Sequence, residues 1–119
     1  DVEVVVPVPL HPKKLRQRGY NQSEWIARGI AAAMQKPLSA ANLQRVRFTP
    51  TQTRKTRFER WRNVEGIFAV ENPEEFAGKH LLLVDDVVTT GSTLEAAAFA
   101  LLQAGAARVS IATLACAES

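Results

Sequence analysis

The stretch that decides the fold runs Leu81-Leu82-Leu83-Val84-Asp85-Asp86-Val87-Val88-Thr89-Thr90-Gly91-Ser92-Thr93. The apolar run His80–Val84 predicts a strand of a parallel sheet, because strands covered on both faces are apolar throughout. We expect a loop at Asp85–Gly91 and an alanine-rich helix at Ser92–Ala104, ended by Gly105. Arg108–Leu114 supplies the next strand. This order and spacing predict a right-handed crossover between parallel neighbours.

Outward from this unit, the amino-terminal residues predict another buried strand and a basic loop. Val2–Val8 is β-branched and almost wholly apolar, as in a buried parallel strand. Pro9, Pro12 and Gly19 interrupt the basic stretch that follows, and we therefore expect it to be a loop.

A helix is expected next, from a cap at Asn21 or Ser23 to about Gln35, because Pro37 then stops it. The residues expected on its apolar side are Trp25, Ile26, Ile30, Ala33 and Met34. Core packing is the favoured interpretation of Trp25.

The middle of the chain predicts two short strands around a long loop. Leu43–Phe48 and Val64–Val70 are the strand candidates, and Thr49–Asn63 between them is polar, basic and without apolar periodicity. Structureless loops of this length are usually functional. We expect residues 1–119 to form one small, doubly wound α/β domain with a parallel sheet, cut from a longer chain.

Composition is that of a globular protein, with 46% hydrophobic and 23% charged residues. The single cysteine, Cys116, cannot form an internal disulfide or a zinc site, and we expect it to be a small buried side chain in a cytoplasmic protein. No apolar run approaches the length of a membrane span.

Positive charge is concentrated in two segments. The net charge is +3, and 11 of the 15 Lys and Arg residues lie in His11–Arg18 and Gln44–Arg62, where Glu59 is the only acid. This separation of charge favours a polyanionic partner, either a polyphosphate or a nucleic acid.

The loop after His80–Val84 has the residues to bind a phosphorylated sugar. Asp85 and Asp86 follow the strand, where their carboxylates can accept hydrogen bonds from a diol. Small hydroxyl residues and Gly91 let backbone N–H groups approach a phosphate, at the start of the helix from Ser92. A purely structural role, with Thr and Ser capping the helix, stays open. A Walker B strand is rejected because the chain has no P-loop, and a receiver domain because too few residues follow Asp86.

Over these 13 positions the chain resembles the motif by which type I phosphoribosyltransferases bind 5-phosphoribosyl-1-diphosphate (PRPP). The resemblance implies that Asp85 and Asp86, the expected catalytic residues, hold the ribose hydroxyls. The residues expected around the 5-phosphate are Thr89, Thr90, Gly91, Ser92 and Thr93. Mg²⁺ would arrive with PRPP, without a direct protein ligand.

A narrower resemblance, to the ComF family named for competence in DNA uptake, covers Val6 to Leu114. It is carried by VPVPLHPKKLRQRGYNQSEWIA, QRVRFTPTQTR and ERWRNVEGIFAV, in that order before the PRPP motif. It implies a diphosphate loop made of Pro9, Leu10, His11, Lys13, Lys14, Arg16 and Arg18. It also implies a flexible hood over PRPP that includes Pro50, Gln52, Arg54, Lys55 and Arg57. ComF proteins usually carry an amino-terminal zinc ribbon with four cysteines, which this sequence lacks.

Two functional hypotheses follow. In the first, the domain transfers the phosphoribosyl group of PRPP to an acceptor and releases diphosphate. In the second, it is a non-catalytic module that senses PRPP or a nucleotide and binds single-stranded DNA through its basic loops. Trp61 with Arg60 and Arg62 is the expected nucleic-acid contact, and Tyr20 is a further aromatic able to stack on bases. A homodimer is compatible with either hypothesis, and the sequence leaves the acceptor open.

Overall fold

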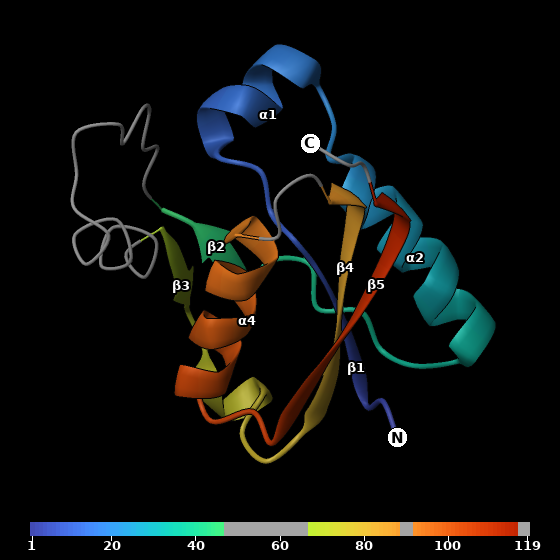
Figure 1. Cartoon of the computed structure of the whole chain (residues 1–119), viewed down its shortest axis with the longest axis vertical. Coiled ribbons are helices and arrows are strands. Elements are labelled where there is room, and N and C mark those ends of the chain that lie inside the picture. Colours follow the sequence, from blue (N-terminus) through green and yellow to red (C-terminus); the bar gives the residue numbers. More distant parts are fainter. Residues whose placement is uncertain (47–66, 89–91, 117–119) are drawn as a thin grey trace.

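A three-stranded parallel sheet forms the centre of the molecule (Figure 1). The structure is a computed structural model that describes residues 1–46, 67–88 and 92–116. The strand order is β1 (Val4–Pro7), β4 (His80–Val88) and β5 (Arg108–Cys116), and both neighbouring pairs are parallel. The predicted strand–helix–strand unit is therefore confirmed, with the helix α4 at Ser92–Gln103.

Helices cover both faces of this sheet, which confirms the doubly wound α/β prediction. Side chains of β1 alternate between the faces: Val4 and Val6 join the core that includes Leu101 of α4, whereas Val5 packs with Ala27 of α2 (Gln22–Met34). Central β4 alternates in the same way and is apolar because both of its faces are buried.

A short antiparallel hairpin lies beside α4, on the same side of the sheet (Figure 1). It consists of β2 (Leu43–Arg45) and β3 (Phe68–Val70), followed by the 3-10 helix η1 (Pro73–Glu75). Both predicted strands are confirmed in part, because Val46 and Ile67 are described but lie outside the observed strands. The predicted loop 49–63 and the outer ends of the two predicted strands lie outside the described residues.

The basic segment after β1 is a helix, α1 (Pro12–Arg18), so the predicted loop is wrong. Pro12 begins the helix, where its missing N–H costs nothing, and His11 Nδ1 accepts a hydrogen bond from the backbone N–H of Lys13 at 3.1 Å. Gly19 ends it at φ 89°, a left-handed conformation that glycine adopts without strain. The residues read as loop signals are thus the two boundaries of a helix.

The predicted buried side of α2 is only partly right. Trp25 is 66% exposed and Met34 39%, whereas the buried residues are Ser23, Ala27 and Ala31. Small side chains on this side allow the helix axis to lie close to the sheet, where a tryptophan would not fit. Ile26 and Ile30 are partly buried at the edge of this contact, as expected, and Ala33 is exposed.

No helix in the described ranges is long and apolar enough to cross a membrane. Cys116 is the last residue of β5, and the expectation that its side chain is buried lies outside what the structure describes.

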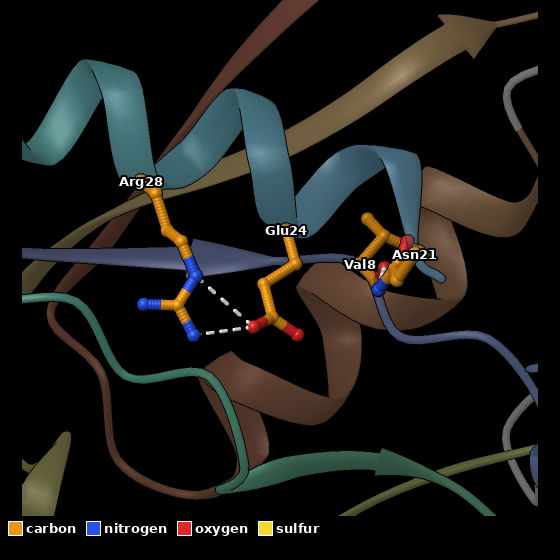
Figure 2. Close-up of polar contacts among 4 residues, drawn as sticks. All are labelled: Val8, Asn21, Glu24 and Arg28. Carbon is orange, nitrogen blue, oxygen red and sulfur yellow. Dashed lines mark hydrogen bonds and ion pairs between the residues drawn. The ribbon is translucent and has the colours of Figure 1, made fainter. Parts of the chain in front are cut away.

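Asn21 ties the start of α2 to the end of β1 (Figure 2). Its Oδ1 accepts a hydrogen bond from the backbone N–H of Ser23 at 3.1 Å, and its Nδ2 donates one to the carbonyl of Val8 at 3.1 Å. The first bond is an N-terminal helix cap and the second crosses to another segment. One amide therefore fixes both the start of the helix and its place beside the strand.

We expect Asn21→Ala to lower the free energy of unfolding by about 2 kcal/mol, roughly half from the lost cap and half from the lost bond to Val8. Asn21→Asp should lose less, because its carboxylate still caps the helix but cannot donate to the Val8 carbonyl. Urea unfolding followed by circular dichroism measures both. Equal losses in the two variants would contradict the double role of this amide.

Candidate functional site

The candidate site lies at the carboxyl end of the central strand. β4 runs through Asp85 and Asp86 to Val88, so the two acids belong to the strand and not to the predicted loop. Backbone pairing with β5 extends β4, with Asp85 opposite Thr113, and the Thr113 hydroxyl donates to the Asp86 carbonyl at 3.1 Å. The sheet thus holds the backbone of both acids at the edge where parallel α/β proteins bind ligands.

The Asp85 carboxylate is held by two donors on one oxygen. Ser23 Oγ of α2 donates to Asp85 Oδ1 at 2.8 Å, and the backbone N–H of Asp86 donates to the same atom at 2.9 Å. Ser23 is only 4% exposed, so its hydroxyl is not free to turn to solvent. The two bonds to Oδ1 set the orientation of the carboxylate, and with it the position of Oδ2, before a ligand binds.

Burial raises the pKa of Asp85 above its ordinary value, and the hydrogen bonds from Ser23 and Asp86 oppose the rise. The neighbouring carboxylate of Asp86 adds to the rise by repulsion. A half-buried carboxylate that loses water is better at accepting hydrogen bonds from a ligand than one in bulk solvent. The site therefore keeps a charged acceptor at a cost in stability.

Arg45 of β2 is a cation near enough to the site for the charge of Asp85 to affect its pKa. Burial lowers the pKa of Arg45, and the charge of Asp85 opposes that change. The guanidinium lies over the ring of Phe68, 5.3 Å from its centroid, which fixes its place on the hairpin. The charge of Asp85 thus acts on Arg45 although the two residues are 40 positions apart in sequence.

The helix α1 lies at the end of the molecule where β4 and β5 end (Figure 1). All seven of its residues are exposed, including the predicted diphosphate residues Lys13, Lys14, Arg16 and Arg18. Of the other residues predicted for that group, Pro9, Leu10 and His11 are partly exposed and link β1 to α1. All seven predicted residues thus lie at the same end of the sheet as Asp85, where the parallel strands have their carboxyl ends.

Several predicted residues lie outside the described part of the chain. They are the phosphate-loop residues Thr89, Thr90 and Gly91, the hood residues Pro50, Gln52, Arg54, Lys55 and Arg57, and the predicted nucleic-acid contacts Arg60, Trp61 and Arg62. Ser92 begins α4, but its side chain is not described, and Thr93 is partly buried in the first turn. The described part of β4 ends at Val88 and α4 begins at Ser92, so the predicted phosphate loop lies between these two elements in the sequence.

Ser23 and Arg45 are site residues that sequence reasoning missed. Ser23 was considered only as a helix cap, and Arg45 only as one of many basic residues. Nothing local to either residue indicates an interaction with Asp85, because the hydrogen bond of Ser23 and the charge interaction of Arg45 both arise from tertiary packing.

Within the described residues, no group of three or more His, Cys, Asp or Glu side chains could hold a metal ion.

Comparison with known proteins identifies the family. A model of the phosphoribosyl transferase domain matches residues 21–119. DNA utilization protein YhgH of Salmonella typhi is 38% identical over 107 residues, which cover 90% of this chain and 46% of that protein. Competence protein ComFC of Bacillus subtilis is 37% identical over 93% of this chain and 43% of its own length. Competence protein F of Haemophilus influenzae is 34% identical over 77% of this chain and 41% of its own length.

The chain thus spans less than half the length of these curated relatives. The fold is also that of a solved structure, TT1426 from Thermus thermophilus, with a TM-score of 0.54. That match covers 98% of this chain and 75% of the other, at 17% identity, and so concerns the fold alone. The family model matches most of the chain, and the three curated relatives exceed 30% identity over at least 77% of it. The chain therefore belongs to the type I phosphoribosyltransferases, and within them to the ComF family.

Proposed function

We propose that this domain binds PRPP with Mg²⁺ at the carboxyl end of β4 and transfers its phosphoribosyl group to an acceptor. The observation that carries the proposal is the preset Asp85 carboxylate, held by Ser23 and Asp86 near the carboxyl end of β4. The names of the curated relatives, in competence and DNA utilization, support a role for the domain in handling DNA.

Asp85 and Asp86 would bind the ribose hydroxyls. A hydroxyl donates well to a charged carboxylate, and Asp85 is already oriented by its two donors on Oδ1. The start of α4 at Ser92 would then receive the 5-phosphate, because the first backbone N–H groups of a helix have no partner within it. Diol and phosphate would be bound by consecutive parts of one segment.

The leaving diphosphate would face the positive residues near the same edge. Exposed cations of α1 would approach it from the β1 side, and Arg45 would add positive charge from the hairpin. Mg²⁺, carried by the phosphates, supplies further charge neutralisation. These groups favour the state in which negative charge builds up on the departing oxygen.

The reaction itself is a substitution at C1 of the ribose. The bond between C1 and the diphosphate oxygen breaks, and its electron pair leaves with diphosphate. An acceptor nucleophile forms the new bond at C1 and gives up its proton to solvent or to a base. The carboxylates of Asp85 and Asp86 hold the ring while positive charge develops on it, so that positioning and charge supply most of the rate.

The double substitution Asp85→Asn with Asp86→Asn should abolish PRPP binding, because an amide is a much weaker acceptor than a carboxylate. Isothermal titration of Mg²⁺-PRPP into the 119-residue domain measures this, and release of diphosphate reports turnover. Glu71→Gln with Glu74→Gln removes two exposed carboxylates after β3 and should leave binding unchanged. Wild-type affinity in the Asp85 and Asp86 variant would refute the site, and binding without turnover would favour the sensing module.

Asp85→Asn alone should raise the midpoint of thermal unfolding at neutral pH. The folded-state pKa of Asp85 is raised, so the folded protein is penalised for the charged form and loses stability as pH rises through that pKa. Asparagine avoids the penalty, and its Oδ1 can still accept from Ser23 and Asp86. Thermal scans from pH 3 to pH 7 should show the gain fade at acid pH. A gain that grows toward acid pH would contradict this account.

Ser23→Ala should weaken PRPP binding roughly tenfold, because it removes one donor from the site carboxylate. It should also move the acid limb of the binding profile to higher pH, since the lost bond favours the charged form of Asp85. Ser39→Ala is the matched control: Ser39 is 6% exposed and donates to Glu75 at 3.0 Å, in a network without Asp85. Calorimetry at several pH values separates the two variants. Equal loss of affinity in both would reduce Ser23 to a packing role.

A further inference from the structure

Two exposed aromatic side chains line a hollow at the start of α2. Tyr20 is 46% exposed and Trp25 is 66% exposed, although burial of either large ring in a core would stabilise the fold. Among the described residues, the walls of this hollow of about 510 Å³ are Tyr20, Gln22 and Trp25. The PRPP site described above uses none of these three side chains.

The geometry of the helix start explains why the two aromatics lie together. With Asn21 as the cap, Tyr20 precedes the cap and Trp25 is the fourth residue of the helix. These are the two positions that pack against each other as a hydrophobic staple. A staple requires only apolar side chains, so it accounts for the pairing but not for two rings that remain so exposed.

Cations near this hollow point in more than one direction. In a helix with 3.6 residues per turn, Lys13 and Arg16 share one side of α1, and Lys14 and Arg18 lie about 150° away from them. One diphosphate cannot contact both sides of a helix at once. At least one pair is therefore available to a second anion.

The segment that forms α1 and the start of α2 carries little negative charge of its own. No acidic residue occurs between Val4 and Ser23. The first one that follows, Glu24, is paired with Arg28, whose Nη2 donates to Glu24 Oε2 at 2.6 Å (Figure 2). The surface formed by α1 and the start of α2 therefore combines the four cations of α1 with two aromatic faces.

We propose that this surface binds single-stranded DNA. Phosphates would contact the cations of α1, and exposed bases would stack on Tyr20 and Trp25, with the Gln22 amide at the rim of the hollow. A single strand is the polyanion that fits, because its bases are free to stack whereas those of a duplex are not. This surface is where the DNA role proposed above would be located in the domain. The proposal for this surface does not depend on whether the domain binds PRPP.

The test uses a fluorescein-labelled dT20 oligonucleotide and fluorescence anisotropy. Tyr20→Leu with Trp25→Leu keeps an apolar staple but removes both ring faces. This variant should bind dT20 about tenfold or more weakly, since stacking contributes about 1–3 kcal/mol per base, and should unfold near the wild-type temperature. In a Trp61→Phe background Trp25 is the only tryptophan, and its fluorescence should be quenched on saturation with dT20.

Charge reversal tests the cations one side at a time. One double variant carries Lys13→Glu with Arg16→Glu, and the other carries Lys14→Glu with Arg18→Glu. At least one of the two should bind dT20 more weakly, with an affinity that depends less on salt. Lys36→Glu with Arg108→Glu is the matched control, because it makes the same change of charge at exposed sites after α2 and at the start of β5. The control should keep most of the affinity.

Any of three results would overturn the proposal. The first is unchanged dT20 affinity in the Leu variant, and the second is Trp25 fluorescence that dT20 does not quench. The third is a loss of dT20 affinity in the control as large as in both α1 variants. Sedimentation of the same proteins tests the other candidate occupant, a second copy of the chain. If the wild type is a dimer and the Leu variant is a monomer with unchanged dT20 affinity, the hollow is a dimer contact. Mg²⁺-PRPP titrated into each variant keeps the two proposals apart, because the Leu variant should bind PRPP normally.

Discussion

The hydrogen bond from Ser23 to Asp85 joins the two parts of the chain on which the site depends. Asp85 lies at the end of β4, the strand in the middle of the sheet, and Ser23 lies in the first turn of α2. That turn is itself fixed to the end of β1 by Asn21. The bond can form only when β1, β4 and α2 have their native arrangement, so the orientation of the carboxylate is a direct product of the fold.

This arrangement has a cost that the rest of the domain must offset. Burial raises the pKa of Asp85, which means that the folded state is destabilised by the charge it keeps at neutral pH. Nothing in the packing of the sheet needs a charged group there, since the core residues of β4 before it are apolar. A group that opposes folding and is nevertheless held by two donors is typical of a binding or catalytic site.

The sequence predicts the fold well where a single physical signal dominates. The apolar run Leu81–Val84 indicates a strand with both faces covered, and together with the alanine-rich stretch after it led correctly to β4, α4 and β5. Pro12 and Gly19 misled because each residue fits a helix boundary as well as a loop. Trp25 misled because hydrophobicity alone does not show that alanines let α2 lie closer to the sheet. The hydrogen bond of Ser23 to Asp85 and the charge interaction of Arg45 with it were beyond prediction, because they arise from packing between distant segments.

The first turn of α2 has a place in both proposed functions. Ser23 points its hydroxyl inward at Asp85, whereas Tyr20 and Trp25 stand on the outer, exposed side of the same turn. These residues are rigidly related because the cap at Asn21 sets where the helix begins. A ligand stacked on the outer side would stabilise the turn that supplies the donor on the inner side. If the two ligands influence each other through this turn, the effect of each on the binding of the other must be equal.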